Sequence, residues 1–215
     1  MNVLVTGFEP FDSETINPSW EVARALHGWT CEGARVHAGQ MPCVFGAALT
    51  ALHEAIAALQ PALVIAVGQA GGRCDFTPER VAINVDDGRI CDNAGRQPID
   101  TPVVAGAPAA YFSTLPIKSI VREVRAAGVP ASVSNSAGTF VCNHLFFGLM
   151  HRLASLPPGA VRGGFIHIPF LPAQAARFPG EPSLSLEMGM AALRIAVSTS
   201  LRVRDDVREA GGQLH

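Results

Sequence analysis

The sequence of 215 residues lacks the charge patterns that accompany several common functions. It has no cluster of Lys and Arg, and its formal net charge is −2. Nucleic-acid and membrane-surface roles both need a concentrated positive patch, so neither is indicated. No apolar run is long enough to span a bilayer, and a strand begins at Val3 without a preceding basic segment, so we expect a cytoplasmic protein. A small or neutral substrate suits this composition better.

Paired cysteine motifs and nucleotide-binding motifs are also missing. The five cysteines form an odd set without CxxC spacing, so the sequence predicts reduced thiols with neither a disulfide framework nor a zinc site. They are Cys31, Cys43, Cys74, Cys91 and Cys142. A glycine-rich turn, Gly68-Gln69-Ala70-Gly71-Gly72, matches neither GxGxxG nor GxxxxGK[ST]. Its glycines more plausibly let backbone amides approach a substrate carbonyl.

What the chain does have is a large apolar fraction, arranged in alternating strand and helix patterns. Hydrophobic residues make up 48% and charged residues 16%. The patterns predict strands at 3–7, 62–67, 80–85, 131–135 and 164–168, and helices at 18–26, 45–59, 116–127, 145–153 and 184–201. A surface excursion is expected over 86–107. We predict one α/β domain over 1–215: a three-layer α/β/α sandwich with a mainly parallel, twisted central sheet.

The most informative segment runs from Ser134 to His144. It leads from a short strand through Gly138 to a cysteine, Cys142, at the start of a helix. Helix N-termini favour negative charge, so we expect the pKa of this thiol to fall and the thiolate to be populated near neutral pH. The alternative is a buried, inert cysteine, because free cysteines are often buried.

His167 is the best-placed of the seven histidines to act as a base. It lies near the carboxyl end of the next predicted strand, so the strand before Cys142, the Cys142 helix and the His167 strand form one expected βαβ unit. Sites in parallel sheets lie beyond the carboxyl ends of the strands. Cysteine and histidine would then share one edge, where imidazole takes the thiol proton. The alternative is a core histidine bonded to backbone. His144 and His151 alone make a poor metal site.

A third group is needed to orient the imidazole. Glu79 is our choice, because it follows the glycine-rich turn and begins the Arg80 strand. An ordinary surface ion pair with Arg80 is the alternative role for Glu79. From spacing alone, Asp75, Asp86 or Asp87 would serve as well.

Three blocks of sequence together resemble the pyroglutamyl peptidase I (pyrrolidone-carboxylate peptidase) family of cysteine peptidases. They are 68–73 with 77–84, 136–144, and 164–169, and the likeness runs from Val5 to the C-terminal Gly211-Gly212-Gln213-Leu214-His215. The resemblance implies a thiol protease, an omega peptidase that removes an N-terminal pyroglutamyl (5-oxoproline) residue from peptides. It implies no cofactor or metal, and a homo-oligomer, either dimer or tetramer.

The resemblance also assigns roles to residues of this chain. Cys142, His167 and Glu79 match the family's catalytic Cys-His-Glu set. The implied substrate contacts are Phe8, Phe11, Phe140 and Val141 around the lactam ring, the Gln69 backbone at its polar edge, and Arg89 and Ile90 nearby. A neutral lactam has no ammonium to bind, so apolar walls with few amide contacts suit it. Cys43 departs from the family, where we expect threonine; if it lines the pocket, substrate affinity should change.

Three other functions remain open at this point. A cysteine amidase acting on another small amide would use the same side chains. A binding protein that keeps the pocket without turnover is a second possibility. A thiol redox role is the third, although no CxxC partner is present.

Overall fold

The computed structural model describes residues 1–212, so Gln213, Leu214 and His215, the end of the family likeness, lie outside the described residues. A six-stranded sheet forms the centre, with strand order β2-β3-β1-β4-β8-β5. These strands are β1 (Asn2–Phe8), β2 (Thr30–Cys31), β3 (Ala34–Met41), β4 (Leu63–Gln69), β5 (Thr77–Pro78) and β8 (Arg162–Ile168). The strands β3, β1, β4 and β8 run parallel, and β2 and β5 are antiparallel to their neighbours.

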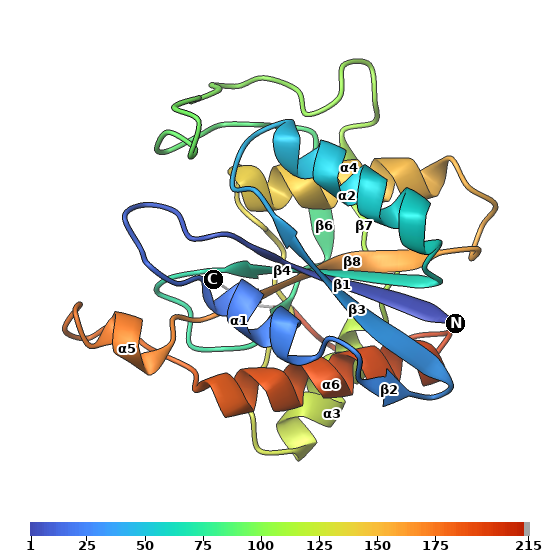
Figure 1. Ribbon diagram of the computed structural model, residues 1–215. Helices are drawn as coiled ribbons and strands as arrows, with labels where there is room; N and C mark the ends of the chain where they lie inside the picture. Colours follow the sequence, from blue (N-terminus) through green and yellow to red (C-terminus); the bar gives the residue numbers. More distant parts are fainter. Residues whose placement is uncertain (213–215) are drawn as a thin grey trace.

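Helices cover both faces of this sheet (Figure 1). On one face lie α2 (Ala47–Leu59) and α4 (Val141–Ala154); on the other lie α1 (Pro18–Ala25), α3 (Ile117–Ala126) and α6 (Leu186–Arg202). Two apolar clusters fill the spaces between these layers. The predicted α/β architecture with a mainly parallel sheet and helices on both faces is therefore confirmed.

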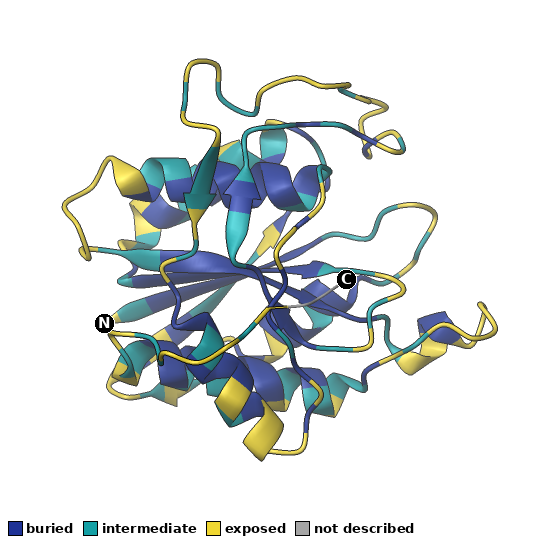
Figure 2. Cartoon of the chain, turned by 180° about the vertical axis from the view of Figure 1, so that it is seen from behind, coloured by how far each residue is buried: buried dark blue, intermediate teal, exposed yellow. Residues whose placement is uncertain are grey.

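Most predicted elements exist close to their expected bounds, and local chemistry explains several of them. Asn17 caps α1 by accepting a hydrogen bond from the Ser19 amide, and Pro18 occupies the first helical position. The apolar run ending at Gly68 is β4, which is almost wholly buried because helices cover both of its faces. The expected excursion after residue 85 extends beyond α2 and α4 and is largely exposed (Figures 1 and 2).

Two predictions about strands were wrong. The segment 131–135 is not a strand of the central sheet; it makes only isolated bridges, Phe76 with Ala131 and Glu79 with Ser134. These bridges place β5 between that segment and β8, so the expected βαβ unit with adjacent ends does not form. The strand expected at 80–85 is the short β6 (Val81–Ile83), which pairs with β7 (Ala110–Phe112) in a separate two-stranded sheet.

Five elements were not predicted: the strands β2, β3, β5 and β7 and the short helix α5 (Pro172–Ala175). In β3, buried and exposed positions mix with polar residues, so it lacks the continuous apolar run that marks β4. Helix α5 has four residues, too few to show a periodic pattern.

Candidate active site

Cys142 is the second residue of α4, and the turn before it is built to expose this end of the helix. Gly138 has a φ of +75°, a left-handed conformation that favours glycine, and its amide donates to the Ser136 hydroxyl at 3.1 Å. Phe140 is extended at the N-cap. Thr139 donates its hydroxyl to the Asp87 carbonyl at 2.8 Å, which fastens this turn to the surface excursion.

The sulfur of Cys142 lies over Gly68 near the end of β4. A methyl group on Gly68 would come within 2.9 Å of Sγ, so the sulfur occupies space that only a glycine leaves free. Gly68 is also the register partner of His167 on β8. Since adjacent strands lie roughly 4.8 Å apart, the thiol sits above the residue next to the histidine.

His167 is oriented by Glu79 from the neighbouring antiparallel strand. The distance between His167 Nδ1 and Glu79 Oε1 is 2.7 Å, and Glu79 is fully buried. An ionised carboxylate only accepts hydrogen bonds, so Nδ1 carries the proton and donates it. The tautomer that results leaves Nε2 without a proton and free to accept one. Strand β5 places the carboxylate here, because its Thr77 pairs directly with His167.

Arg73 joins the carboxylate to the loop that leads to the cysteine. Its Nη1 donates to Glu79 Oε1 at 2.6 Å, and its Nη2 donates to the Ser136 carbonyl at 2.8 Å. Sequence reasoning assigned no role to this arginine, although it directly follows the glycine-rich turn. A single guanidinium therefore ties two parts of the site together.

Burial and neighbouring groups together set the charge states of His167 and Glu79. Burial lowers the pKa of His167 below its ordinary value, and the hydrogen bond and charge of Glu79 only partly oppose this. For Glu79, burial acts to raise the pKa, but the hydrogen bond and charge of His167 and the charge of Arg73 outweigh it, so the pKa is lowered. The pair therefore rests as a neutral imidazole beside a carboxylate.

The pKa of Cys142 is raised, contrary to the sequence-based expectation. Burial is the largest cause, the neighbouring Cys43 and Glu79 add to it, and Arg73 opposes it. The helix N-terminus favours the thiolate as predicted, yet the apolar cluster against which the half-buried Cys142 packs leaves little water to solvate a charged sulfur. Both pKa shifts disfavour a resting thiolate–imidazolium pair.

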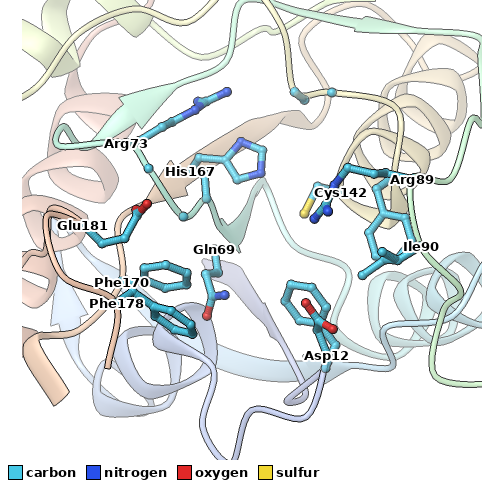
Figure 3. Close-up of a pocket in the computed structure, with 17 residues that line it drawn as sticks. Asp12, Gln69, Arg73, Arg89, Ile90, Cys142, His167, Phe170, Phe178 and Glu181 are labelled. Carbon is cyan, nitrogen blue, oxygen red and sulfur yellow. The ribbon is translucent and has the colours of Figure 1, made fainter. Parts of the chain in front are cut away.

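The thiol and the imidazole open into one cavity of about 620 Å³ (Figure 3). Its walls include five of the seven residues implied as substrate contacts: Phe11, Gln69, Arg89, Ile90 and Phe140. The other two side chains, Phe8 and Val141, are buried in the apolar cluster between the sheet and α4 instead. Glu79 lies behind His167 and does not reach the cavity.

Cys43 is buried below the cavity and is absent from its lining. It packs in the same apolar cluster as Cys142, and burial raises its pKa to about 12. Sequence reasoning missed several residues that line the cavity: Asp12, Arg73, Phe170, Phe178 and Glu181. Asp12, Phe170, Phe178 and Glu181 come from loops, where no periodicity marks them.

The other candidate groups are engaged elsewhere. Asp86 accepts from His144 Nδ1 at 2.8 Å, and His144 Nε2 accepts from the Gly46 amide at 2.9 Å. These bonds pin the excursion and the loop before α2 to the Cys142 helix. His151 instead lies 2.9 Å from the Tyr111 hydroxyl.

Residues 1–212 hold no group of three or more His, Cys, Asp or Glu arranged to bind a metal ion. Among their helices, none combines the length and apolar character needed to cross a membrane.

A cysteine at a helix N-terminus, an imidazole beside it and a buried carboxylate behind form the arrangement that cysteine peptidases and related thiol hydrolases use. Comparison with known proteins places the chain among these proteins. It belongs to the pyroglutamyl peptidase family, whose sequence profile matches residues 1–203.

Relatives and solved structures agree over nearly the full length. The chain is 68% identical over 213 residues to the pyrrolidone-carboxylate peptidase of Cupriavidus taiwanensis, covering 99% of both chains. It resembles the crystal structure of pyroglutamyl peptidase I from Bacillus amyloliquefaciens with a TM-score of 0.93 and 50% identity, covering 96% of this chain and 99% of that one. A mutant pyrrolidone carboxyl peptidase from Pyrococcus furiosus gives a TM-score of 0.91 and 41% identity, covering 94% and 99%.

Proposed function

We propose that the chain hydrolyses the amide bond after an N-terminal pyroglutamyl residue, with Cys142 as nucleophile, His167 as general acid and base, and Glu79 as the orienting carboxylate. The observation that carries this proposal is the 2.7 Å bond between His167 Nδ1 and Glu79 Oε1, directly beside the cavity that exposes Cys142. Family membership supports the substrate class.

In the first step, His167 Nε2 takes the thiol proton as the Cys142 sulfur attacks the pyroglutamyl carbonyl carbon. The sulfur–carbon bond forms, and the carbonyl π electrons move to oxygen. Backbone amides at the start of α4, together with Arg89, stabilise this oxyanion. Removing one such donor typically costs roughly 100- to 1,000-fold in rate.

In the second step, the oxyanion collapses and the carbon–nitrogen bond breaks. His167 returns its proton to the departing amine, which leaves a thioester on Cys142. Water then enters, gives a proton to His167 and attacks the thioester. Pyroglutamate leaves, and the thiol takes its proton back.

The apolar part of the cavity suits a lactam ring. Phe11 and Phe140 have ring centroids 6.2 Å apart, and Phe45 supports Phe140 edge-on at 5.4 Å. With Ile90 they form uncharged walls that hold a neutral ring without an ionic contact. Gln69 supplies the polar edge from the end of β4. The side chains of Phe8 and Val141 contribute from below, by packing.

A fluorogenic pyroglutamyl amide tests the proposal under reducing conditions. Wild type should release the fluorophore, Cys142→Ala should not, and a prolyl amide should be inert to both. Cys74→Ala is a matched control, because Cys74 is an exposed free cysteine and should keep full activity. Full activity in Cys142→Ala, or loss of wild-type activity with a chelator, would contradict the mechanism.

We further propose a cytoplasmic homo-oligomer, either a dimer or a tetramer. All five cysteines are free, which suits a reducing compartment. The exposed Ile99 and Phe112 are 59% and 68% accessible and offer apolar area for a contact between copies. Light scattering at several concentrations measures the mass; a single 22.6 kDa species throughout would refute an oligomer.

A further inference from the structure

The cavity extends beyond the space that the lactam ring needs. Figure 3 shows Arg89 and Ile90 on the Cys142 side, and Phe170, Phe178 and Glu181 on the other side of His167 and Gln69. The proposed mechanism uses Arg89 together with Cys142 and His167. It gives no role to Phe170, Phe178 and Glu181.

The two rings on that side form a ledge, defined here as Phe170 and Phe178. Their centroids are 6.0 Å apart and the ring planes are inclined by only 23°, a stacked arrangement. The Phe170 ring lies against Gly71, where a Cβ would come within 2.5 Å of it. The Arg177 guanidinium lies 5.4 Å from the centroid of Phe178.

Buried polar contacts fix the segment that carries the ledge. Gln174 is 1% exposed, and its Nε2 donates to Gln69 Oε1 at 3.1 Å and to Glu14 Oε2 at 3.2 Å. Arg177 forms an ion pair with the same Glu14. At the other end, the Leu184 amide donates to the Phe170 carbonyl at 2.9 Å. The ledge is thus attached to Gln69, a residue at the centre of the cavity.

Phe178 nevertheless keeps 43% of its surface exposed beside the catalytic pair. A large aromatic side chain held in this position by an anchored frame offers apolar area that a ligand can cover. Covering it would contribute binding energy without any rearrangement of the frame.

The direction of the substrate follows from the proposed function, on which this inference rests. With the lactam ring on the Phe11 and Ile90 side and the carbonyl at Cys142, the scissile nitrogen must face His167 to receive its proton. The residue after pyroglutamate then continues over the glycine-rich turn toward the ledge. We infer that Phe170 and Phe178 form a leaving-group subsite that selects a large apolar or aromatic side chain at the residue following pyroglutamate.

Two peptide amides test this inference: pyroglutamyl-phenylalanine amide and pyroglutamyl-glycine amide, compared by kcat/KM. The wild type should favour the phenylalanine substrate. Phe178→Ala should lower its kcat/KM by about 2- to 10-fold, the range expected for one aromatic contact, and leave the glycine substrate within twofold. Phe178→Leu, which keeps apolar area, should recover part of the loss. Leu156→Ala is the control, because Leu156 is an exposed apolar side chain that does not line the cavity.

The outcomes separate this inference from the proposed function. If the wild type cleaves both substrates and Phe178→Ala changes neither, or lowers both equally, the subsite is refuted while the peptidase proposal stands. If the wild type cleaves neither substrate, the proposed function fails, and the inference fails with it.

Discussion

Cys142 should be a protonated thiol in the free protein at neutral pH. Thiolates react with iodoacetamide and thiols do not, so the alkylation rate of this side chain as a function of pH reports its charge state. We expect the rate to be low at pH 7 and to keep rising beyond pH 9, because burial raises the pKa of Cys142 above its ordinary value.

The two possible resting states differ enough to be separated clearly. At the ordinary thiol pKa of 9.0 the thiolate fraction at pH 7 is about 1%, since each pKa unit is a factor of ten, and burial makes it smaller still. A stored thiolate–imidazolium pair would be almost fully ionised at that pH. The alkylation rate at pH 7 thus differs roughly 100-fold or more between the two states.

Mass spectrometry of the peptide that contains Cys142 gives its alkylation rate separately from the other thiols. The exposed Cys74 and Cys91 serve as internal standards in the same digest. Thiolate absorbance near 240 nm, measured as the difference between wild type and Cys142→Ser, provides a second readout. Alkylation of Cys142 that is fast and independent of pH between about 5 and 8 would refute the reasoning, because it would show a stored ion pair.

Other perturbations test the remaining contacts of the site. Glu79→Gln should lower kcat roughly 100- to 10,000-fold with KM little changed, because the imidazole loses the carboxylate that fixes its tautomer; a KM effect alone would count against that role. The free energy of unfolding should fall as pH drops below about 6.5 and again below about 4.5, because folding lowers the pKa values of His167 and Glu79 from these ordinary values and the unfolded chain therefore binds more protons; urea titrations at pH 4 to 8 measure this. Gly68→Ala should cost about 1–3 kcal/mol of stability and reduce kcat, since its methyl group would displace the Cys142 sulfur or the Phe165 ring; unchanged thermal melting and turnover would contradict the packing. Asp86→Ala should cost about 1–3 kcal/mol by leaving a buried imidazole N–H of His144 unpaired, and an unaltered urea midpoint would argue against that bond.

Much of the fold follows from local sequence signals. The Asn17-Pro18 cap, the continuous apolar run of β4 and the helical spacing after residue 144 each predict an element that the structure contains. These signals work because they depend on backbone chemistry or on burial of a whole face. The edge strand β2 and its neighbour β3 lack them, since β2 has only two residues and exposed positions interrupt the buried ones in β3.

Strand order could not be deduced from the sequence, and this limits what was predictable about the site. Cys142 and His167 do lie near each other as predicted, but the prediction relied on a βαβ unit that does not form. Strand β5 lies between the two expected neighbours and delivers Glu79 to His167. Spacing alone could not separate Glu79 from Asp86, because the long-range pairing that brings β5 beside β8 has no local signature. The prediction of a lowered pKa for the Cys142 thiol was wrong for a similar reason. The helix terminus is visible in the sequence, whereas the packing around it is not.

The position of β8 between β4 and the edge strand β5 has a consequence for the chain during its own synthesis. Strand β8 pairs with β4 on one side and β5 on the other, and it carries His167, which lies far beyond Glu79 and Cys142 along the sequence. A growing chain that has not yet produced residues 162–168 can pair β2, β3, β1 and β4, but it leaves the edge strand β5 without a strand to pair with and has no His167 imidazole for the thiol. If His167 acts as proposed, peptidase activity cannot appear on a partly made chain, and its onset in a synthesis or refolding experiment marks the addition of β8 and β5 to the sheet.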